Sequence, residues 1–475
     1  MTRNVRAQSN PRLELPEGWI EGLAEPGLQA FLGIPYAAPP SGSLRWQSPQ
    51  PPAPWPGVLS CNRFGTAALQ AAADGQGHTG GFDCLRLNVW RPAEGSGPWP
   101  VMVWVPGGGF LRGSTAEPLY SGSAMARRGV VFVSVGYRLG VDGFMHFDGD
   151  APNRGLQDLL AALQWVQANI ARFGGDPRRT TLAGVSAGAG AVAHLLGMVE
   201  SDGLFDRVIL QSPSLQTHDR EDAERIRRAL AGVLGVAPTR NAIANVPPGP
   251  LTQALHGFFG NESLKRHWGL RPRNFFPVRP VVDGLLLRAK PSEAVAARAA
   301  SAHRHISVVL GCNAEEMRLF HVPGGAIDRI DMTQVQGFAD DIGWPVPPAS
   351  PTESAGDLLC RIQTDYYYHR PATELEQVLR AVGSKTYVYE FRWRSPLYAG
   401  RLGAAHGMEI PFALGHVQTD RAREFAGIDD LPDGAEDMHR AWVDFASAAP
   451  STWMPGPEGL RIFQPGSRLS QPRAT

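Results

Sequence analysis

The sequence predicts an α/β fold in which a large, mostly parallel central sheet is flanked by helices. Apolar runs of strand length recur along the chain, and helical patterns separate them. The clearest helical pattern covers about 155–172, where leucines, Val166 and Ile170 recur at helical spacing before a Gly174-Gly175 stop. Because the strand-like runs are apolar on both faces, they are typical of a parallel sheet that helices cover.

The expected strands are, in chain order, 101–105, 130–135, 179–183, 208–210, 306–310 and 386–391. Most of them are runs of β-branched, leucine or aromatic residues, which favour buried strands. The proline-rich segment 39–56 is expected to cross the surface irregularly and not to link two domains, because tryptophan and arginine residues interrupt it.

The chain is expected to form a single domain over residues 1–475, since no internal repeat divides it. Two regions, about 216–275 and about 325–382, break the alternation of strands and helices with charged, helix-like sequence. We interpret them as helical insertions around the carboxyl edge of the sheet. The polar ends, about 1–14 and 466–475, are expected to be frayed.

Charge and composition limit the classes of partner that we expect the protein to bind. Lys and Arg number 45, as do Asp and Glu, so the formal net charge is zero and no nucleic-acid partner is expected. No apolar run reaches the ~18–20 residues that a membrane span needs, so no membrane partner is expected. The four cysteines lack metal-ligand spacing, and the first thirty residues lack a secretory signal pattern. We therefore expect a cytoplasmic protein with neither a metal nor another cofactor.

The stretch 184–188 reads Gly-Val-Ser-Ala-Gly and matches G-x-S-x-G. It lies between a strand-like run and an apolar helix-like run, which is the strand–turn–helix context that this nucleophile motif requires. Such a turn exposes the Oγ of Ser186 and directs the N–H of Ala187 toward a developing oxyanion. The alternative is a glycine-rich helix entry with a buried serine.

Three glycines, Gly107, Gly108 and Gly109, follow the expected strand 101–105. Their backbone N–H groups are free to approach a ligand oxygen, as in a loop that donates hydrogen bonds to an oxyanion. The alternatives are a plain glycine-rich turn or a phosphate-binding loop, but the Lys-Ser/Thr that a phosphate loop needs is missing.

A serine nucleophile also needs an acid and a base, in the chain order serine, acid, histidine. Glu315 and Glu316 follow the expected strand 306–310, and His406 lies in a loop of small residues. Spacing does not choose between the two glutamates, and it does not single out His406 among thirteen histidines. A surface carboxylate and an ordinary loop histidine are the alternatives.

Taken together, the motifs resemble those of the type B carboxylesterase family over about residues 18–465. That family includes cholinesterases and bacterial carboxylesterases. The matching segments are 31–40, 44–46, 83–90, 107–110, 137–140, 153–158, 169–177, 282–284 and 406–412.

The resemblance implies an α/β-hydrolase fold and a serine carboxylesterase that acts on a small-molecule ester. It implies that Ser186 is the nucleophile, Glu316 the acid and His406 the base. The oxyanion donors are then the N–H groups of Gly108, Gly109 and Ala187. The alternatives are a carbamate or aryl-amide hydrolase with the same triad, and a non-catalytic binding protein. Members of that last type lack the nucleophile.

The chain departs from the family pattern at several positions without losing a triad residue. These positions are Phe82, Pro106, Val185, Pro213 and Met317. They put rate and specificity in question, but not the type of reaction.

The family resemblance also bears on a disulfide and on a choline site. Cys84 matches a position that forms a disulfide in secreted members, but its partner position, near Ala67-Ala68, holds no cysteine, so free thiols are expected. Between Cys61 and Cys84 the only aromatic residues are Phe64 and Phe82. The tryptophan that stacks on choline in cholinesterases is absent there, so no cation–π site for a quaternary ammonium is expected at that place.

Overall fold

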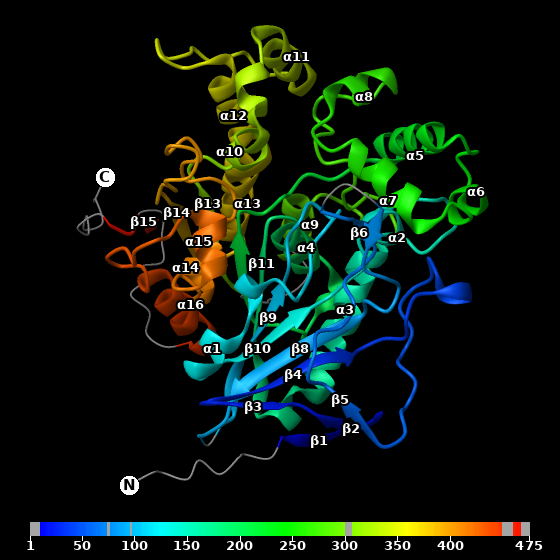
Figure 1. Ribbon diagram of the computed structural model, residues 1–475, viewed down its shortest axis with the longest axis vertical. Coiled ribbons are helices and arrows are strands. Elements are labelled where there is room, and N and C mark those ends of the chain that lie inside the picture. The colour runs from blue at the N-terminus through cyan, green and yellow to red at the C-terminus, as the bar shows by residue number, and fades with distance from the viewer. Residues whose placement is uncertain (1–9, 74–76, 96, 300–305, 449–458, 467–475) are drawn as a thin grey trace.

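The computed structural model describes residues 10–73, 77–95, 97–299, 306–448 and 459–466. In this part of the chain, a ten-stranded sheet has the order β15-β14-β13-β12-β11-β9-β10-β8-β4-β3 (Figure 1). Its strands are β3 (Leu23–Glu25), β4 (Leu28–Pro35), β8 (Arg86–Pro92), β9 (Trp99–Val105), β10 (Val131–Val135), β11 (Gly175–Val185), β12 (Arg207–Gln211), β13 (Ser307–Asn313), β14 (Thr386–Phe391) and β15 (Leu460–Phe463). All neighbours from β15 to β10 are parallel, which confirms the predicted α/β class.

The other edge of the sheet is antiparallel, because β8 pairs with β10 and β4, and β3 pairs with β4. The apolar-run argument does not find these strands, since β8 carries polar residues within it. Its buried Asn88 accepts a hydrogen bond from the Gly33 amide (2.8 Å) and donates one to the Ser134 hydroxyl (2.9 Å). A polar side chain thus joins the three strands β4, β8 and β10 inside the core.

A small sheet of β1 (Arg12–Leu15), β2 (Gly18–Glu21) and β5 (Val58–Ser60) lies beside the large one. The expected frayed end at 1–14 is therefore too long, because residues 12–15 pair in register with β2. Residues 1–9 and 467–475 lie outside the described part of the chain. A short hairpin, β6 (Gln70–Ala71) and β7 (His78–Thr79), completes the strands described.

Helices cover the sheet in two groups (Figure 1). In the first group, α3 contacts α4, α4 contacts α9, and α9 contacts α13. In the second group, α1 packs against β8 and β10, and α16 packs against β9 and β11. Their bounds are α1 (Ser123–Arg127), α3 (Arg154–Asn169), α4 (Ala187–Leu196), α9 (Pro291–Ala299), α13 (Arg370–Ala381) and α16 (Asp437–Ser447). The predicted helix 155–172 corresponds to α3 and the short 3-10 turn after it, and Gly174 in the left-handed conformation ends that turn.

Further helices lie beyond the carboxyl ends of the strands (Figure 1). They are α5 (Arg220–Leu234), α6 (Arg240–Ala244), α7 (Pro248–Gly257), α8 (Glu262–His267), α10 (Arg318–His321), α11 (Met332–Ile342) and α12 (Ala355–Thr364). The short helices α2 (Gly140–Phe144), α14 (Ile410–Leu414) and α15 (Asp420–Ala426) complete the set described. Within the second predicted insertion, α13 contacts β13 and β14, so the end of that segment covers the sheet itself.

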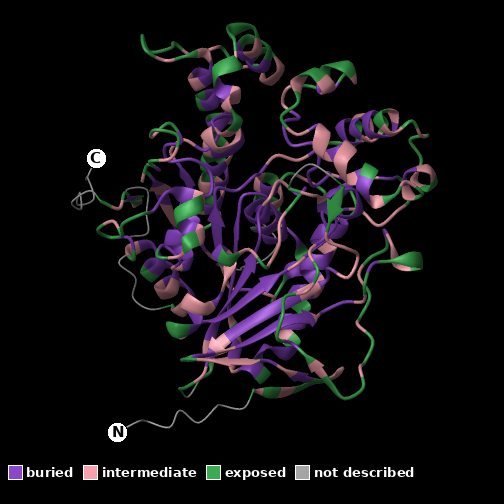
Figure 2. Ribbon diagram, in the orientation of Figure 1, coloured by how far each residue is buried: buried purple, intermediate pink, exposed green. Residues whose placement is uncertain are grey.

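The core centres on the sheet, whose strands are buried along most of their length (Figure 2). Several buried polar side chains are paired with one another. Arg138 donates two hydrogen bonds to Asp158, at 2.8 and 2.6 Å, and both side chains are buried. Asn153 donates to Asp283 at 2.6 Å and joins the start of α3 to a distant loop. These pairs satisfy polar groups that burial would otherwise destabilise.

Candidate active site

Ser186 lies in a strained turn between β11 and α4, with φ 58° and ψ −125°. The turn fits only because its neighbours lack side chains: a Cβ on Gly184 would lie 2.8 Å from the carbonyl carbon of Gly188, and one on Gly188 would overlap the carbonyl oxygen of Val105. The Ser186 amide donates to the carbonyl oxygen of Gln211 at 2.8 Å. The serine is thereby fixed at the carboxyl edge of the sheet, where it is 8% exposed.

The glycine loop after β9 packs against this turn. A Cβ on Gly107 would lie 2.8 Å from the carbonyl oxygen of Val185 and 3.0 Å from the Cβ of Ser186. Gly108 and Gly109 have φ values of +123° and +65°, which L-residues with side chains rarely adopt. The loop therefore brings backbone next to the serine as closely as glycine permits.

Glu316 and His406 form a buried pair beside the serine turn. The Nδ1 of His406 lies 2.6 Å from an Oε of Glu316, and the other Oε accepts the Asn313 amide at 2.7 Å. The His406 amide also donates to the Glu316 carbonyl oxygen at 3.1 Å. The rings of Tyr368 and Phe320 lie 4.8 and 5.5 Å from the imidazole. Backbone, carboxylate and ring contacts thus fix both the position and the orientation of His406.

The opposite nitrogen of His406, Nε2, is buried and has no hydrogen-bond partner among the described residues. His406 and Ser186 line the same cavity, which has a volume of about 200 Å³. A buried polar nitrogen without a partner is uncommon and calls for an explanation. Here that nitrogen can receive a proton or donate one to a bound molecule.

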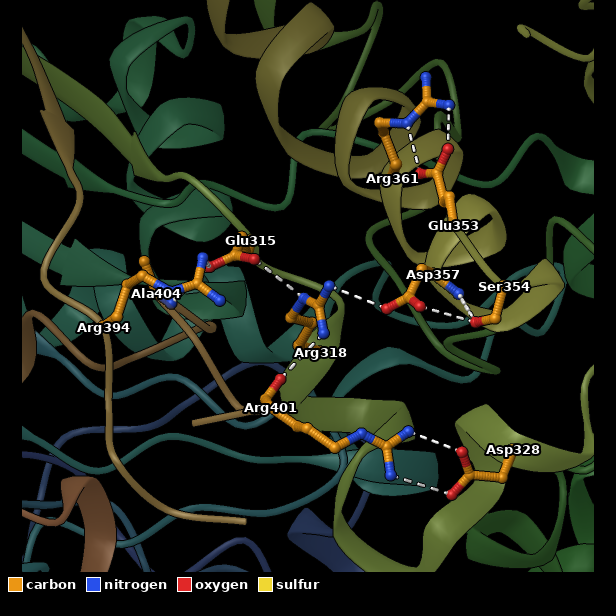
Figure 3. Close-up of polar contacts among 10 residues, drawn as sticks. All are labelled: Glu315, Arg318, Asp328, Glu353, Ser354, Asp357, Arg361, Arg394, Arg401 and Ala404. Atoms are coloured by element: carbon orange, nitrogen blue, oxygen red, sulfur yellow. Dashed lines mark hydrogen bonds and ion pairs between the residues drawn. The ribbon is translucent and has the colours of Figure 1, made fainter. Parts of the chain in front are cut away.

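The two neighbouring glutamates have different partners. Figure 3 shows Glu315 between Arg318 and Arg394, at 3.0 and 2.5 Å, and its carboxylate also accepts the Ala404 amide at 2.9 Å. Arg318 continues to Asp357 at 2.8 Å (Figure 3). Glu315 therefore ties the segment that leads to His406 to the end of β13, whereas Glu316 contacts the imidazole.

The predicted site residues come together at one place. Gly108, Gly109, Ser186 and His406 line the cavity, and Glu316 contacts His406. Ala187 follows Ser186 as the first residue of α4, and its side chain is fully buried. The catalytic roles of these six residues remain predictions.

A third buried carboxylate, Glu409, is missing from the sequence-based set. It accepts hydrogen bonds from the side chains of Asn313 (2.6 Å) and Gln211 (3.1 Å). Burial, together with the nearby charge of Glu316, raises the pKa of Glu409. The position of Glu409 shortly after His406 in the 406–412 motif is the signal that could have revealed it.

The rest of the cavity is mainly apolar. Phe259, Phe276 and Phe320, which we call the aromatic wall, have ring centroids 5.6 to 6.0 Å apart. The other apolar side chains that line it are Leu111, Val185, Leu319, Ile410 and Phe425. Val185, one of the departures from the family pattern, therefore faces the site.

The cysteines do not offer a second nucleophile. All four are buried free thiols, and burial raises the pKa values of Cys61 and Cys360 to about 12. Within the described residues, no group of three or more His, Cys, Asp or Glu side chains could hold a metal ion. In the same part of the chain, every helix is too short or too polar to cross a bilayer.

Comparison with known proteins gives consistent matches. Residues 9–341 match the model of the family described as the carboxylesterase family. The chain is 35% identical to the fumonisin B1 esterase of Sphingopyxis macrogoltabida, over 93% of this chain and 83% of that protein. It is 32% identical to the para-nitrobenzyl esterase of Bacillus subtilis, over 92% and 89%. A crystal structure of a carboxylesterase from Geobacillus stearothermophilus aligns with a TM-score of 0.79 and 30% identity, over 94% of this chain and 93% of that one.

Proposed function

The chain belongs to the carboxylesterase family, whose members are carboxylic ester hydrolases, and on that premise we propose that it cleaves esters through an acyl-enzyme on Ser186. One observation carries the proposal: His406 is bound to Glu316 through Nδ1, its Nε2 has no hydrogen-bond partner among the described residues, and His406 lines the same cavity as Ser186. Activation of a serine requires a histidine whose one ring nitrogen is held by an acid and whose other ring nitrogen is free to accept a proton.

In the proposed reaction, Nε2 of His406 takes the hydroxyl proton of Ser186 as the serine oxygen attacks the ester carbonyl carbon. The N–H groups of Gly108, Gly109 and Ala187 donate to the oxyanion. His406 then gives the proton to the leaving alcohol, and the acyl group remains on Ser186. Water, deprotonated by the same histidine, releases the acid and restores the serine.

Glu316 has a supporting part in this scheme. Its carboxylate holds the Nδ1 proton of His406, so that Nε2 is the basic nitrogen, and its negative charge stabilises the imidazolium that forms. The fixed geometry of the carboxylate, which the Asn313 amide also holds at 2.7 Å, supports this role. The scheme needs neither a metal nor a cofactor. A cytoplasmic location belongs to the same proposal, since unpaired thiols are usual in a reducing compartment.

The test is hydrolysis of p-nitrophenyl esters of increasing acyl length by the wild type and by Ser186→Ala. We expect turnover by the wild type and a loss of about 10⁴-fold or more in the variant, with the same thermal midpoint. Burst-phase release of nitrophenol would reveal the acyl-enzyme. Turnover retained by a folded Ser186→Ala would overturn the assignment. With phenyl carbamates added to the panel, turnover confined to those carbamates would favour the alternative substrate class.

A further inference from the structure

Arg112 lies next to the reacting centre. It follows the glycine loop, its amide donates to the carbonyl oxygen of Gly108 at 3.1 Å, and it lines the same cavity as Ser186 and His406. The residue is exposed, so a molecule in the cavity can reach its guanidinium. The backbone of Arg112 is thus held next to the glycine loop.

The guanidinium of Arg112 has no carboxylate partner among the described residues, and none of the residues that line the cavity is an aspartate or a glutamate. Nearby arginines differ in this respect. Arg421 binds Glu117 at 2.8 Å, and Arg318 binds Glu315 at 3.0 Å. A guanidinium that lines a mostly apolar cavity without a counter-ion leaves its hydrogen-bond donors open to a ligand.

Two residues close to this charge, Phe259 and His256, also line the cavity. The guanidinium lies over the ring of Phe259, with 5.9 Å to the ring centroid. His256, which stacks on the same ring, also lines the cavity, and its pKa is lowered by partial burial and by the charge of Arg112. The positive field therefore reaches into the space where a substrate would lie.

We propose that this esterase prefers esters that carry a carboxylate, and that Arg112 binds this anion beside the scissile bond. The proposal rests on the esterase function above and names its substrate class. A guanidinium matches a carboxylate with two parallel N–H donors, and an apolar surround strengthens the contact. The carboxylate can belong to the acid or to the alcohol part of the ester, and the experiment separates the two.

The experiment compares kcat/KM for matched pairs of substrates at low ionic strength. On the acyl side, the pair is mono-p-nitrophenyl adipate and its methyl ester. On the alcohol side, it is para-acetoxybenzoate and its methyl ester. We expect the wild type to prefer the anionic member of at least one pair by about tenfold or more. The pair that shows the preference identifies the side on which the carboxylate lies.

Three variants test the residue. Arg112→Gln is expected to bring the ratio of anionic to neutral ester close to one, and Arg112→Lys to keep part of it. Arg423→Gln, which removes an exposed arginine that pairs with Asp420 on α15, is the matched control and is expected to keep the wild-type ratio. Thermal midpoints check that each variant is folded.

The outcomes separate this proposal from the one on which it rests. Ser186-dependent turnover of the neutral esters, with a ratio near one in the wild type, overturns the carboxylate preference and leaves the esterase function standing. A preference that Arg112→Gln does not change overturns the role of Arg112. If the folded wild type hydrolyses no ester of either pair, the esterase function and this inference fail together.

Discussion

The cavity is built from two regions that are held in different ways. At the sheet edge, which we define as Gly108, Ser186, Glu316 and His406, backbone conformation and buried hydrogen bonds fix each group. At the aromatic wall, Phe259, Phe276 and Phe320 contact one another through their rings. In the proposed mechanism, a change at the edge therefore alters the reacting groups, whereas a change at the wall alters the space around them.

This difference teaches that reaction and substrate preference are separable in this molecule. The edge leaves little room for larger side chains, since a Cβ on Gly108 would overlap the Arg112 carbonyl oxygen. The wall consists of apolar side chains whose size can change while the sheet stays in place. We expect substitutions at the edge to act on kcat, and substitutions at the wall to act on KM and on the choice of ester.

After Ser186→Ala, the largest effect is expected from Glu316→Gln. An amide cannot stabilise the imidazolium and favours the wrong tautomer of His406, so kcat should fall by about 10³–10⁴-fold. Glu315→Gln is the matched control on the neighbouring residue, and we expect a loss within about tenfold, because its ion pairs are partly exposed and act on the loop. The measurement is kcat for p-nitrophenyl acetate. Equal losses in the two variants would show that the two glutamates do not divide the roles as their contacts indicate.

A smaller effect is expected from Phe276→Ala at the aromatic wall. Phe276 is nearly buried and contacts Phe259 and Phe320, so its loss enlarges the cavity and removes apolar contact from a long acyl chain. KM for the octanoyl ester should rise about tenfold, which corresponds to about 1.4 kcal/mol, while kcat for the acetyl ester changes little. Phe276→Leu keeps most of the apolar volume and serves as the control. A uniform fall in kcat for all esters would argue that the wall also positions the edge.

The same division explains what the sequence could predict. Two parts of the edge carry local patterns: a strand, a sharp turn and a helix give Gly184 to Gly188 a pattern that is visible in a short window, and the glycine loop after β9 is equally compact. The choice of Glu316 over Glu315 was not accessible to spacing and came from the family resemblance. In the structure the two glutamates have different partners, because Glu315 is engaged by Arg318 and Arg394 (Figure 3), whereas Glu316 contacts His406.

The wall and the antiparallel strands were not predictable from local pattern. Phe259 lies in the turn after α7, Phe276 in a loop and Phe320 on α10, and no periodicity in the sequence encodes the contact between them. Asn88 places a polar residue inside a central strand, where its two hydrogen bonds to Gly33 and Ser134 are the compensation. Tertiary partners of this kind override the alternation of polar and apolar residues by which strands are recognised.

The smallest effect on turnover is expected behind the edge, at His194 on α4, where the consequence is stability in acid. Burial lowers the pKa of His194 from 6.5 to about 3, so the folded protein keeps it neutral while the unfolded chain protonates near 6.5. Above pH 6.5, His194 is neutral in both states and does not lower the free energy of unfolding. As the pH falls from there toward 3, protonation of the unfolded chain lowers the free energy of unfolding, by about 2 kcal/mol at pH 5. Urea unfolding at pH 7 and pH 5 should therefore show a smaller loss of unfolding free energy in acid for His194→Leu than for the wild type.

The exposed His78, changed to Gln, is the control and should keep the wild-type loss of unfolding free energy, as should Phe276→Leu. Equal acid losses in His194→Leu and the wild type would mean that the helix behind the nucleophile does not set the acid sensitivity of the edge, and that the other buried histidines carry it.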